Sequence, residues 1–131
     1  MNAYHGPALL TLATSLLLFG CAAYVGRCRI RFAIPAPATS GHPQFDIAYR
    51  IQMNTLENTM LFLPTLWVCA LYGSSLAATA AGTVWLVARA WYALAYARDP
   101  KKRGPAFLLS MLAFGALLVG GAWGLLHACF A

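Results

Sequence analysis

Acidic residues are rare in this sequence: 131 residues contain three, Asp46, Glu57 and Asp99, against nine lysines and arginines. Charged residues make up 9% of the chain, whereas soluble domains usually carry about 25%. The sequence also lacks the repeated ten-residue alternation of apolar and polar positions that marks a transmembrane β-barrel. These absences argue against a soluble domain and a barrel, and they indicate an α-helical integral membrane protein.

Apolar residues, 61% of the chain, gather in long runs. Four segments approach the ~20 residues that an α-helix needs to cross ~30 Å of hydrocarbon. They cover residues 7–26, 47–72, 76–97 and 105–130. Residues 1–131 are therefore predicted to form one domain, an all-α integral membrane bundle of four transmembrane helices. The first segment is expected to be a retained helix, because arginines follow it and nothing basic precedes it, the reverse of a secretory signal.

The positive charge is concentrated beside two of the predicted loops. The basic residues there are Arg27, Arg29, Arg31, Arg50, Arg98, Lys101, Lys102 and Arg103. By the positive-inside rule, loops one and three are expected on the cytoplasmic side and both termini on the opposite side. A charge divided between two short loops, with no recognisable binding motif, argues against a nucleic-acid partner.

Metal-ligand spacing is absent from the sequence. The cysteines (Cys21, Cys28, Cys69, Cys129) form no C-x-x-C pair, and the histidines (His5, His42, His127) are isolated from one another. We therefore expect no metal site, and we interpret the cysteines as small buried apolar residues. Small residues at Ala116, Gly120 and Gly124 recur every fourth position, which predicts close helix packing.

Polar side chains precede the apolar part of the second segment, in the stretch RIQMNTLEN at residues 50–58. On a helix, Arg50, Asn54 and Glu57 point in directions of about 0°, 40° and 340°, so they share a face, while Gln52 lies roughly opposite. In the third segment Arg89, Tyr92 and Tyr96 also share a face, and Arg103 follows near the same direction. Two helices thus present matching polar stripes toward their cytoplasmic ends.

Two interpretations of these stripes remain open. In the structural one, Arg89 pairs with Glu57, Asn54 links two helices, and the tyrosines form an interfacial belt. In the functional one, the surplus of polar groups binds a polar ligand. A charged side chain near the membrane centre costs about 2.5–3.5 kcal/mol, so it persists where it is paired or functional. Several arginines around one carboxylate favour a zwitterion with extra negative charge, and they argue against a cation exporter.

The chain resembles the family of membrane-associated proteins in eicosanoid and glutathione metabolism (MAPEG), which includes microsomal glutathione transferases. The resemblance rests on R-x-Q-x-N-x-x-E at residues 50–57, on ARAWYALAYARDPKKRG at residues 88–104, and on the proline-rich first loop. It implies a homotrimer of four-helix chains with sites between protomers. It also implies that glutathione is the co-substrate and that no metal takes part.

Residue by residue, the resemblance implies glutathione-binding roles for Arg29, Arg50, Gln52, Asn54, Glu57, Tyr92 and Tyr96. It implies that Arg103 is the catalytic residue that stabilises the thiolate. Asn58 stands where some relatives carry a glutathione-contacting tyrosine. The expected function is a membrane-bound glutathione transferase or peroxidase that conjugates glutathione to lipophilic electrophiles or reduces lipid hydroperoxides. The alternative is a non-catalytic membrane protein that binds an anionic lipid or lipid mediator.

Overall fold

Four long α-helices make up most of the chain in a computed structural model that describes residues 3–131. They are α1 (His5–Phe32), α2 (Pro43–Tyr72), α3 (Ser75–Arg98) and α4 (Gly104–Phe130), and the short 3₁₀ helix η1 (Pro100–Lys102) precedes α4. The predicted all-α architecture of four helices is confirmed.

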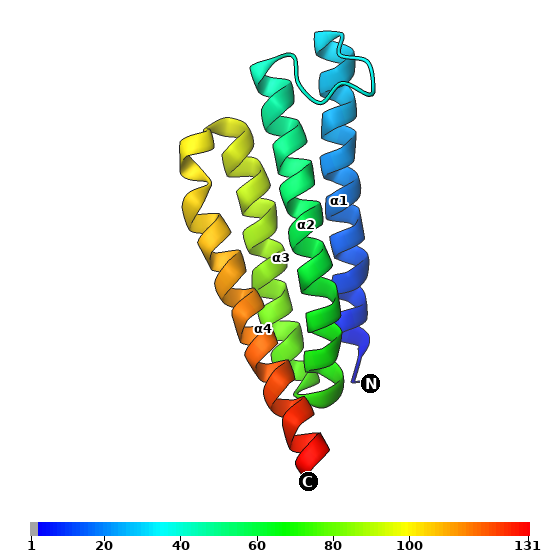
Figure 1. Cartoon of the computed structure of the whole chain (residues 1–131), viewed down its shortest axis with the longest axis vertical. Coiled ribbons are helices and arrows are strands. Elements are labelled where there is room, and N and C mark those ends of the chain that lie inside the picture. The colour runs from blue at the N-terminus through cyan, green and yellow to red at the C-terminus, as the bar shows by residue number, and fades with distance from the viewer. Residues whose placement is uncertain (1–2) are drawn as a thin grey trace.

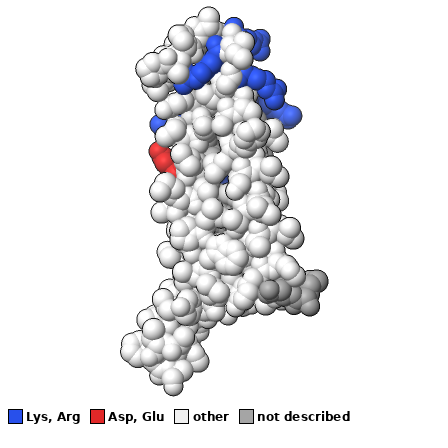
Figure 2. Space-filling model, turned by 90° about the vertical axis from the view of Figure 1, so that its right-hand side faces the viewer, with Lys and Arg blue, Asp and Glu red and all other residues white. Residues whose placement is uncertain are grey.

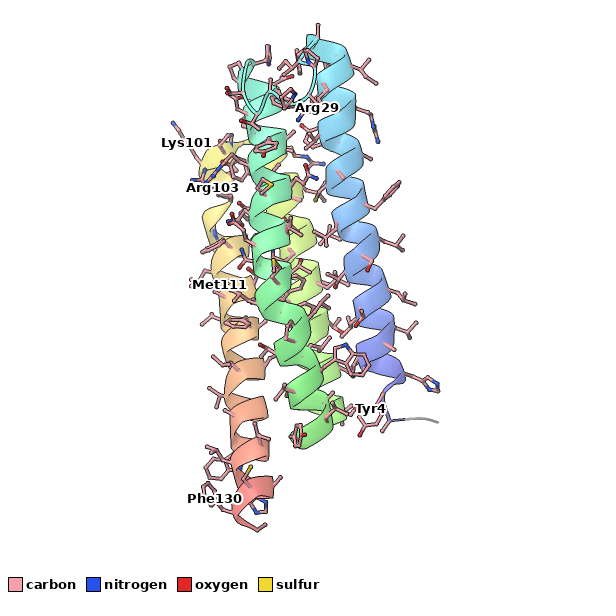
Figure 3. All side chains as sticks on the ribbon, turned by 45° about the vertical axis from the view of Figure 1, so that its right-hand side comes forward. Tyr4, Arg29, Lys101, Arg103, Met111 and Phe130 are labelled. Atoms are coloured by element: carbon pink, nitrogen blue, oxygen red, sulfur yellow. The ribbon has the colours of Figure 1, made fainter. Side chains whose placement is uncertain are left out.

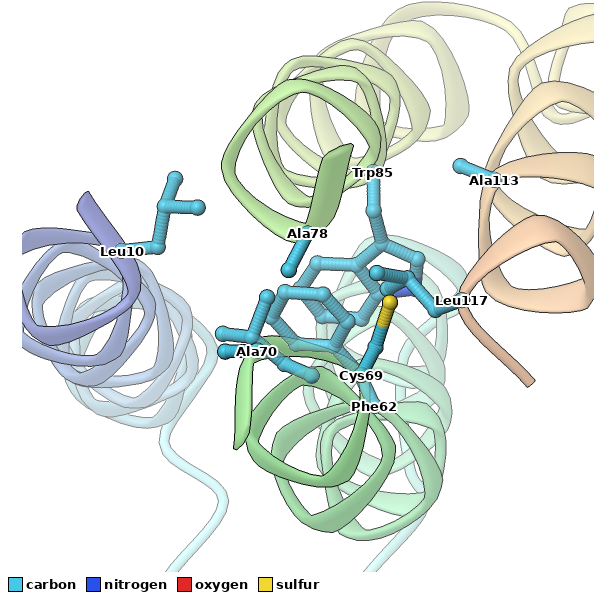
Figure 4. Close-up of a cluster of buried hydrophobic side chains, with 9 residues drawn as sticks. Leu10, Phe62, Cys69, Ala70, Ala78, Trp85, Ala113 and Leu117 are labelled. Carbon is cyan, nitrogen blue, oxygen red and sulfur yellow. The ribbon is translucent and has the colours of Figure 1, made fainter. Parts of the chain in front are cut away.

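Successive helices run antiparallel along the long axis of the molecule (Figure 1). The connections at residues 33–42 and 99–103 lie at one end, here called the basic end. Both termini and the short turn after α2 lie at the other, here called the terminal end. Helices α2 and α3 each contact all three other helices. Helices α1 and α4 flank this central pair on opposite sides (Figure 4).

Helix α1 extends to Phe32, beyond the predicted end at residue 26. The arginines expected in the first loop, Arg27, Arg29 and Arg31, therefore lie on the helix. An arginine ends an apolar run without ending a helix, since it is a good helix former and is favourable near the C-terminus of the helix dipole. The helix ends where Ala33 adopts the left-handed conformation, with φ 53° and ψ 49°.

Side-chain caps fix the starts of the next two helices. Helix α2 begins at Pro43 because Nδ1 of His42 accepts a hydrogen bond from the backbone N–H of Gln44 at 3.1 Å. Asp46 lies in the first turn, as predicted. The Ser74 hydroxyl caps α3 by accepting from the N–H of Ala77 at 3.2 Å. Helix α2 continues through Pro64 without interruption.

A hydrophobic core joins all four helices in the half of the bundle nearer the termini. Its buried members are Leu10, Phe62, Leu66, Cys69, Ala70, Ala78, Trp85, Ala113 and Leu117 (Figure 4). The rings of Phe62 and Trp85 stack at a centroid separation of 3.7 Å, which fixes α2 against α3. A smaller cluster at the basic end contains Val25, Cys28, Ile34, Phe45 and Ala48.

Glycines bring α4 into close contact with the end of α2. A Cβ added at Gly124 would lie 2.2 Å from the carbonyl oxygen of Tyr72, and one added at Gly120 would lie 3.2 Å from the sulfur of Cys69. The close packing predicted from the small-residue ridge is thus confirmed for these two glycines, and it occurs within one chain.

The outer surface of the bundle is largely apolar. Leu9, Leu16 and Phe19 on α1 and Trp123 on α4 are each at least 67% exposed. Helix α1 and the segment Pro100–Phe130 are long and apolar enough to cross a membrane. Lysine and arginine side chains gather at the basic end, whereas the visible part of the terminal end shows none (Figure 2). The bundle therefore has one charged end and a long apolar body.

Candidate functional site

A cavity of about 310 Å³ opens between α2, α3 and α4, toward the basic end. It is lined by Arg50, Asn54, Tyr92, Tyr96, Arg103, Gly104 and Phe107. Five of these residues are ones that the sequence singled out, and the two polar stripes do face one another. The sequence analysis did not predict Gly104 and Phe107. Both lie at the start of the apolar helix α4, and the sequence does not reveal which side of that helix faces the cavity.

The lining of the cavity combines positive charge with aromatic rings. The Arg103 guanidinium lies over the ring of Tyr96, 4.6 Å from its centroid, and its Nη1 donates to the carbonyl oxygen of Pro100 at 3.1 Å. The rings of Tyr92 and Tyr96 meet edge to face at 5.6 Å. No carboxylate is among the lining residues, so the cavity is suited to an anion.

Asn54 is held by a network behind the cavity wall. Its amide oxygen accepts from Nη2 of Arg89 at 2.9 Å and from Nδ2 of Asn58 at 3.3 Å. The Asn58 amide also donates to the backbone carbonyl of Asn54 at 2.8 Å. Because both donors approach the amide oxygen, the NH₂ group of Asn54 is left to donate to a ligand in the cavity. Asn58 is thus connected to the cavity wall through its hydrogen bonds to Asn54.

Arg89 is completely buried between α2 and α3. Besides Asn54, it donates to the hydroxyl of Thr55 at 3.0 Å, and its guanidinium lies 4.1 Å from the ring centroid of Tyr92. Its Nε and Nη1 atoms have no hydrogen-bond partner among residues 3–131. The pairing of Arg89 with Glu57 in the structural interpretation is wrong, because Asn54 and Thr55 face α3 whereas Glu57 is exposed. The expected link between two helices through Asn54 is confirmed.

Arg29 lies at the basic end but outside the cavity, and Figure 3 shows it beside the first loop, apart from Arg103. Its Nη1 donates to the carbonyl oxygens of Ile34 at 3.3 Å and Ala38 at 2.7 Å, and its guanidinium lies over the ring of Phe45 at 4.9 Å. In a single chain, Arg29 therefore holds the first loop against the bundle.

Gln52 and Glu57 also lie outside the cavity. Glu57 is exposed and Gln52 is partly exposed. Gln52 points away from the cavity because it lies on the opposite side of α2 from Arg50 and Asn54. The structure of one chain thus brings together five of the eight predicted residues and leaves three on its surface. Residues 3–131 contain no cluster of three or more potential metal ligands.

The sequence profile of the MAPEG family matches residues 7–123. The chain belongs to the MAPEG family. Microsomal glutathione S-transferase 2 of Homo sapiens is 32% identical to it over 124 residues, which cover 92% of this chain and 84% of that protein. Leukotriene C4 synthase of Cavia porcellus is 37% identical over 119 residues, covering 91% of this chain and 79% of that protein.

A third relative extends the similarity beyond animals. An uncharacterized protein of Synechocystis sp. is 38% identical over 120 residues, covering 92% of this chain and 88% of that protein. The resemblance inferred from residues 50–57 and 88–104 is therefore confirmed across nearly the whole chain. MAPEG proteins are membrane proteins, in agreement with the apolar helices described above.

Proposed function

We propose that this chain is a membrane-bound glutathione transferase that joins glutathione to lipophilic electrophiles. The observation that carries the proposal is the cavity, which presents the guanidiniums of Arg50 and Arg103 and the amide of Asn54 without a lining carboxylate. Glutathione carries two carboxylates, an ammonium group and a thiol, and arginine is well suited to carboxylates. Similarity to a glutathione S-transferase over 92% of the chain supports the same conclusion.

Arg103 is the residue that we assign to the chemistry. A free thiol with a pKa of about 8.5 is mostly protonated at neutral pH, and the thiolate is the nucleophile. A positive charge within ~4–6 Å lowers an acid's pKa by roughly 1 to 3. Arg103 lies at the cavity, and its guanidinium can donate a hydrogen bond to sulfur. The thiolate then forms the carbon–sulfur bond while the leaving group departs with its electron pair.

The same thiolate would also reduce a lipid hydroperoxide. Its sulfur takes the terminal oxygen, which releases the lipid alcohol, and a second glutathione converts the resulting sulfenic acid to the disulfide and water. In both reactions the second substrate dissolves in the bilayer. It would reach the cavity along the apolar outer surface, while glutathione enters from the basic end.

A neighbouring protomer completes the site in this proposal. Glu57 lies on the same side of α2 as Arg50 and Asn54, whereas Gln52 lies on the opposite side. One ligand can therefore contact Asn54 and a Gln52 side chain together only if the glutamine comes from another copy of the chain. A homotrimer in which all four helices span the membrane would place Gln52 and Arg29 of one protomer opposite the cavity of the next.

Mixed oligomers test this arrangement. Chains that carry Asn54→Ala or Gln52→Ala alone are expected to bind glutathione weakly. When they are co-expressed, each intact site needs Asn54 from one chain and Gln52 from the other, so roughly a quarter of the sites are restored. Glutathione binding by calorimetry measures the recovery. No recovery would contradict a site shared between protomers.

Substitution of Arg103 tests the catalytic assignment. Arg103→Leu is expected to abolish the ultraviolet absorbance of bound thiolate and to lower kcat roughly 10- to 1000-fold, while glutathione still binds. Arg103→Lys should retain part of both signals because it keeps the charge, and Arg31→Leu, an exposed arginine away from the cavity, should change neither. An unchanged thiolate signal in Arg103→Leu would remove Arg103 from the mechanism.

Wild-type protein incubated with glutathione and a generic aromatic electrophile separates the enzyme from a silent binding protein. Formation of the thioether supports the proposal. Binding of glutathione without any product, with either the electrophile or a lipid hydroperoxide, would overturn it.

The basic end faces the cytoplasm in this proposal, because short loops rich in lysine and arginine are retained there. The described cysteines are free, and Cys129 is exposed while Cys21, Cys28 and Cys69 are buried. A membrane-impermeant maleimide should therefore label Cys129 from outside intact cells. Labelling only after the membrane is opened would reverse the topology.

A further inference from the structure

A second depression lies on the outer side of α3, and it shares no residue with the candidate site. It has a volume of about 780 Å³ and lies beside the connection between α3 and α4. Trp91, Leu94 and Arg98 line it and recur at helical spacing, on the side of α3 turned away from Tyr92 and Tyr96. The depression therefore opens on the outer surface of the bundle and not into the cavity.

The depression combines an apolar floor with a positively charged rim. Trp91 and Leu94 are 47% and 60% exposed, and the rim carries Arg98, Lys101 and Lys102. Asp99 also lines it, but one of its carboxylate oxygens accepts from the backbone N–H of Lys101 at 3.1 Å. Three cations against one carboxylate leave the rim positive. Figure 2 shows lysine and arginine side chains gathered at this end of the molecule.

An apolar groove of about 500 Å³ continues from the depression. It lies between α1 and α3, is lined by Leu16, Gly20 and Ala97 among others, and shares Leu94 with the depression. An apolar track thus leads from the charged rim into the membrane-embedded part of the bundle. The charged rim and the apolar groove match the polarity of a molecule with an anionic head and an apolar tail.

We propose that the outer side of α3 binds an anionic membrane phospholipid. Its phosphate lies among Arg98, Lys101 and Lys102, and an acyl chain crosses Trp91 and Leu94 into the groove between α1 and α3. Basic residues near a membrane surface favour anionic lipids, and tryptophan is frequent at the level of the headgroups. A zwitterionic phospholipid gains less here, because its own cation offsets the phosphate.

The test compares two charge-removing variants of the full chain in nanodiscs with equal amounts of phosphatidylglycerol and phosphatidylcholine. Arg98→Gln with Lys101→Gln alters the depression. Arg27→Gln with Arg31→Gln removes the same charge from the basic end of α1. Lipids that remain bound after transfer to detergent are quantified by mass spectrometry. We expect the first variant to lose its preference for phosphatidylglycerol at least about tenfold, and the second to keep it.

Three results would overturn this proposal. The first is equal retention by wild type and the Arg98→Gln/Lys101→Gln variant. The second is an equal loss in both variants, which would indicate diffuse attraction to the basic end. The third is a change in oligomer size with lipid retention unchanged, which would make the surface a contact between protomers.

The contribution of the tail is tested with a competitor. Inorganic phosphate should fail to displace bound phosphatidylglycerol, since it lacks the acyl chains that contact the groove. Displacement by phosphate alone would exclude the groove from the site. Glutathione binding should be unaffected by Arg98→Gln with Lys101→Gln, so this test does not depend on the transferase proposal.

Discussion

The two ends of the bundle differ in how their helices are held together. At the terminal end, Gly73, Gly120 and Gly124 let backbones touch, and large apolar side chains fill the space between helices. Toward the basic end, α2 and α3 enclose a fully buried arginine beside an open cavity. Two of the donor atoms of this arginine have no hydrogen-bond partner in the part of the chain that the structure describes. Close apolar packing at the terminal end stabilises the bundle. The buried charge and the cavity toward the basic end reduce its stability.

This division explains why the polar groups stay in place without acidic partners. A buried charge that lacks a counter-ion destabilises its surroundings. The stacked rings of Phe62 and Trp85 hold α2 and α3 together around Arg89, and α4 packs against both helices. The polar region is therefore held in position by the rigid apolar part. The predictions that follow test whether stability and binding separate in this way.

The largest effect is expected at the glycine contact. Gly124→Ala would place a methyl group 2.2 Å from the Tyr72 carbonyl oxygen, so α4 must move away, at a cost of about 3 kcal/mol in the free energy of unfolding. Gly115→Ala on the same helix is the control. Its added Cβ would meet no atom of the described residues within 4 Å, and the substitution should stabilise the protein by up to ~1 kcal/mol. Unfolding in detergent measures both, and similar values would refute the contrast.

Replacement of the buried Arg89 should weaken glutathione binding without lowering stability. Arg89→Met removes an incompletely bonded charge and keeps much of the volume, so stability should hold or rise. Glutathione affinity should fall at least about tenfold, because Asn54 loses a charged hydrogen bond worth roughly 1.5–3 kcal/mol. Calorimetry and thermal unfolding measure the two effects, with Arg27→Met as the control. A collapse of stability would show that Arg89 supports the fold.

The smallest effect is expected at the aromatic ring beneath Arg103. Tyr96→Phe keeps the ring and should change kcat/KM by less than about threefold. Tyr96→Leu removes a cation–π contact worth ~0.5–1 kcal/mol and should lower kcat/KM roughly two- to fivefold. Steady-state kinetics with one electrophile compares the two. If both variants lose the same activity, the hydroxyl rather than the ring is required.

The fold was largely predictable because four long apolar runs leave few alternatives in a membrane. The ends of the helices were not predictable from hydropathy. Charged residues show where an apolar run stops, but α1 ends at the left-handed residue Ala33 and α2 begins at the cap formed by His42. The cap at His42 depends on the backbone angles of the loop. Those angles follow from contacts that a hydropathy pattern does not contain.

The candidate site was predictable where helical periodicity alone decides direction. Arg50 with Asn54, and Tyr92 with Tyr96, are each four residues apart and share a face. The partner of Arg89 was not predictable, because it depends on how far α3 is displaced along α2. The roles proposed for Arg29 and Gln52 involve surfaces between chains, which neither periodicity nor one chain can place.

The hydrogen bonds that Asn54 accepts from Arg89 and Asn58 have a consequence for selectivity. They set the amide in its binding orientation before any guest arrives, so little conformational freedom is lost on association. The polarity of the Asn54 amide is also fixed: its oxygen already accepts two hydrogen bonds inside the protein, so it offers its N–H hydrogens. A guest group that can only donate, such as an ammonium, finds no acceptor on Asn54, so this residue favours the carboxylate end of a zwitterion.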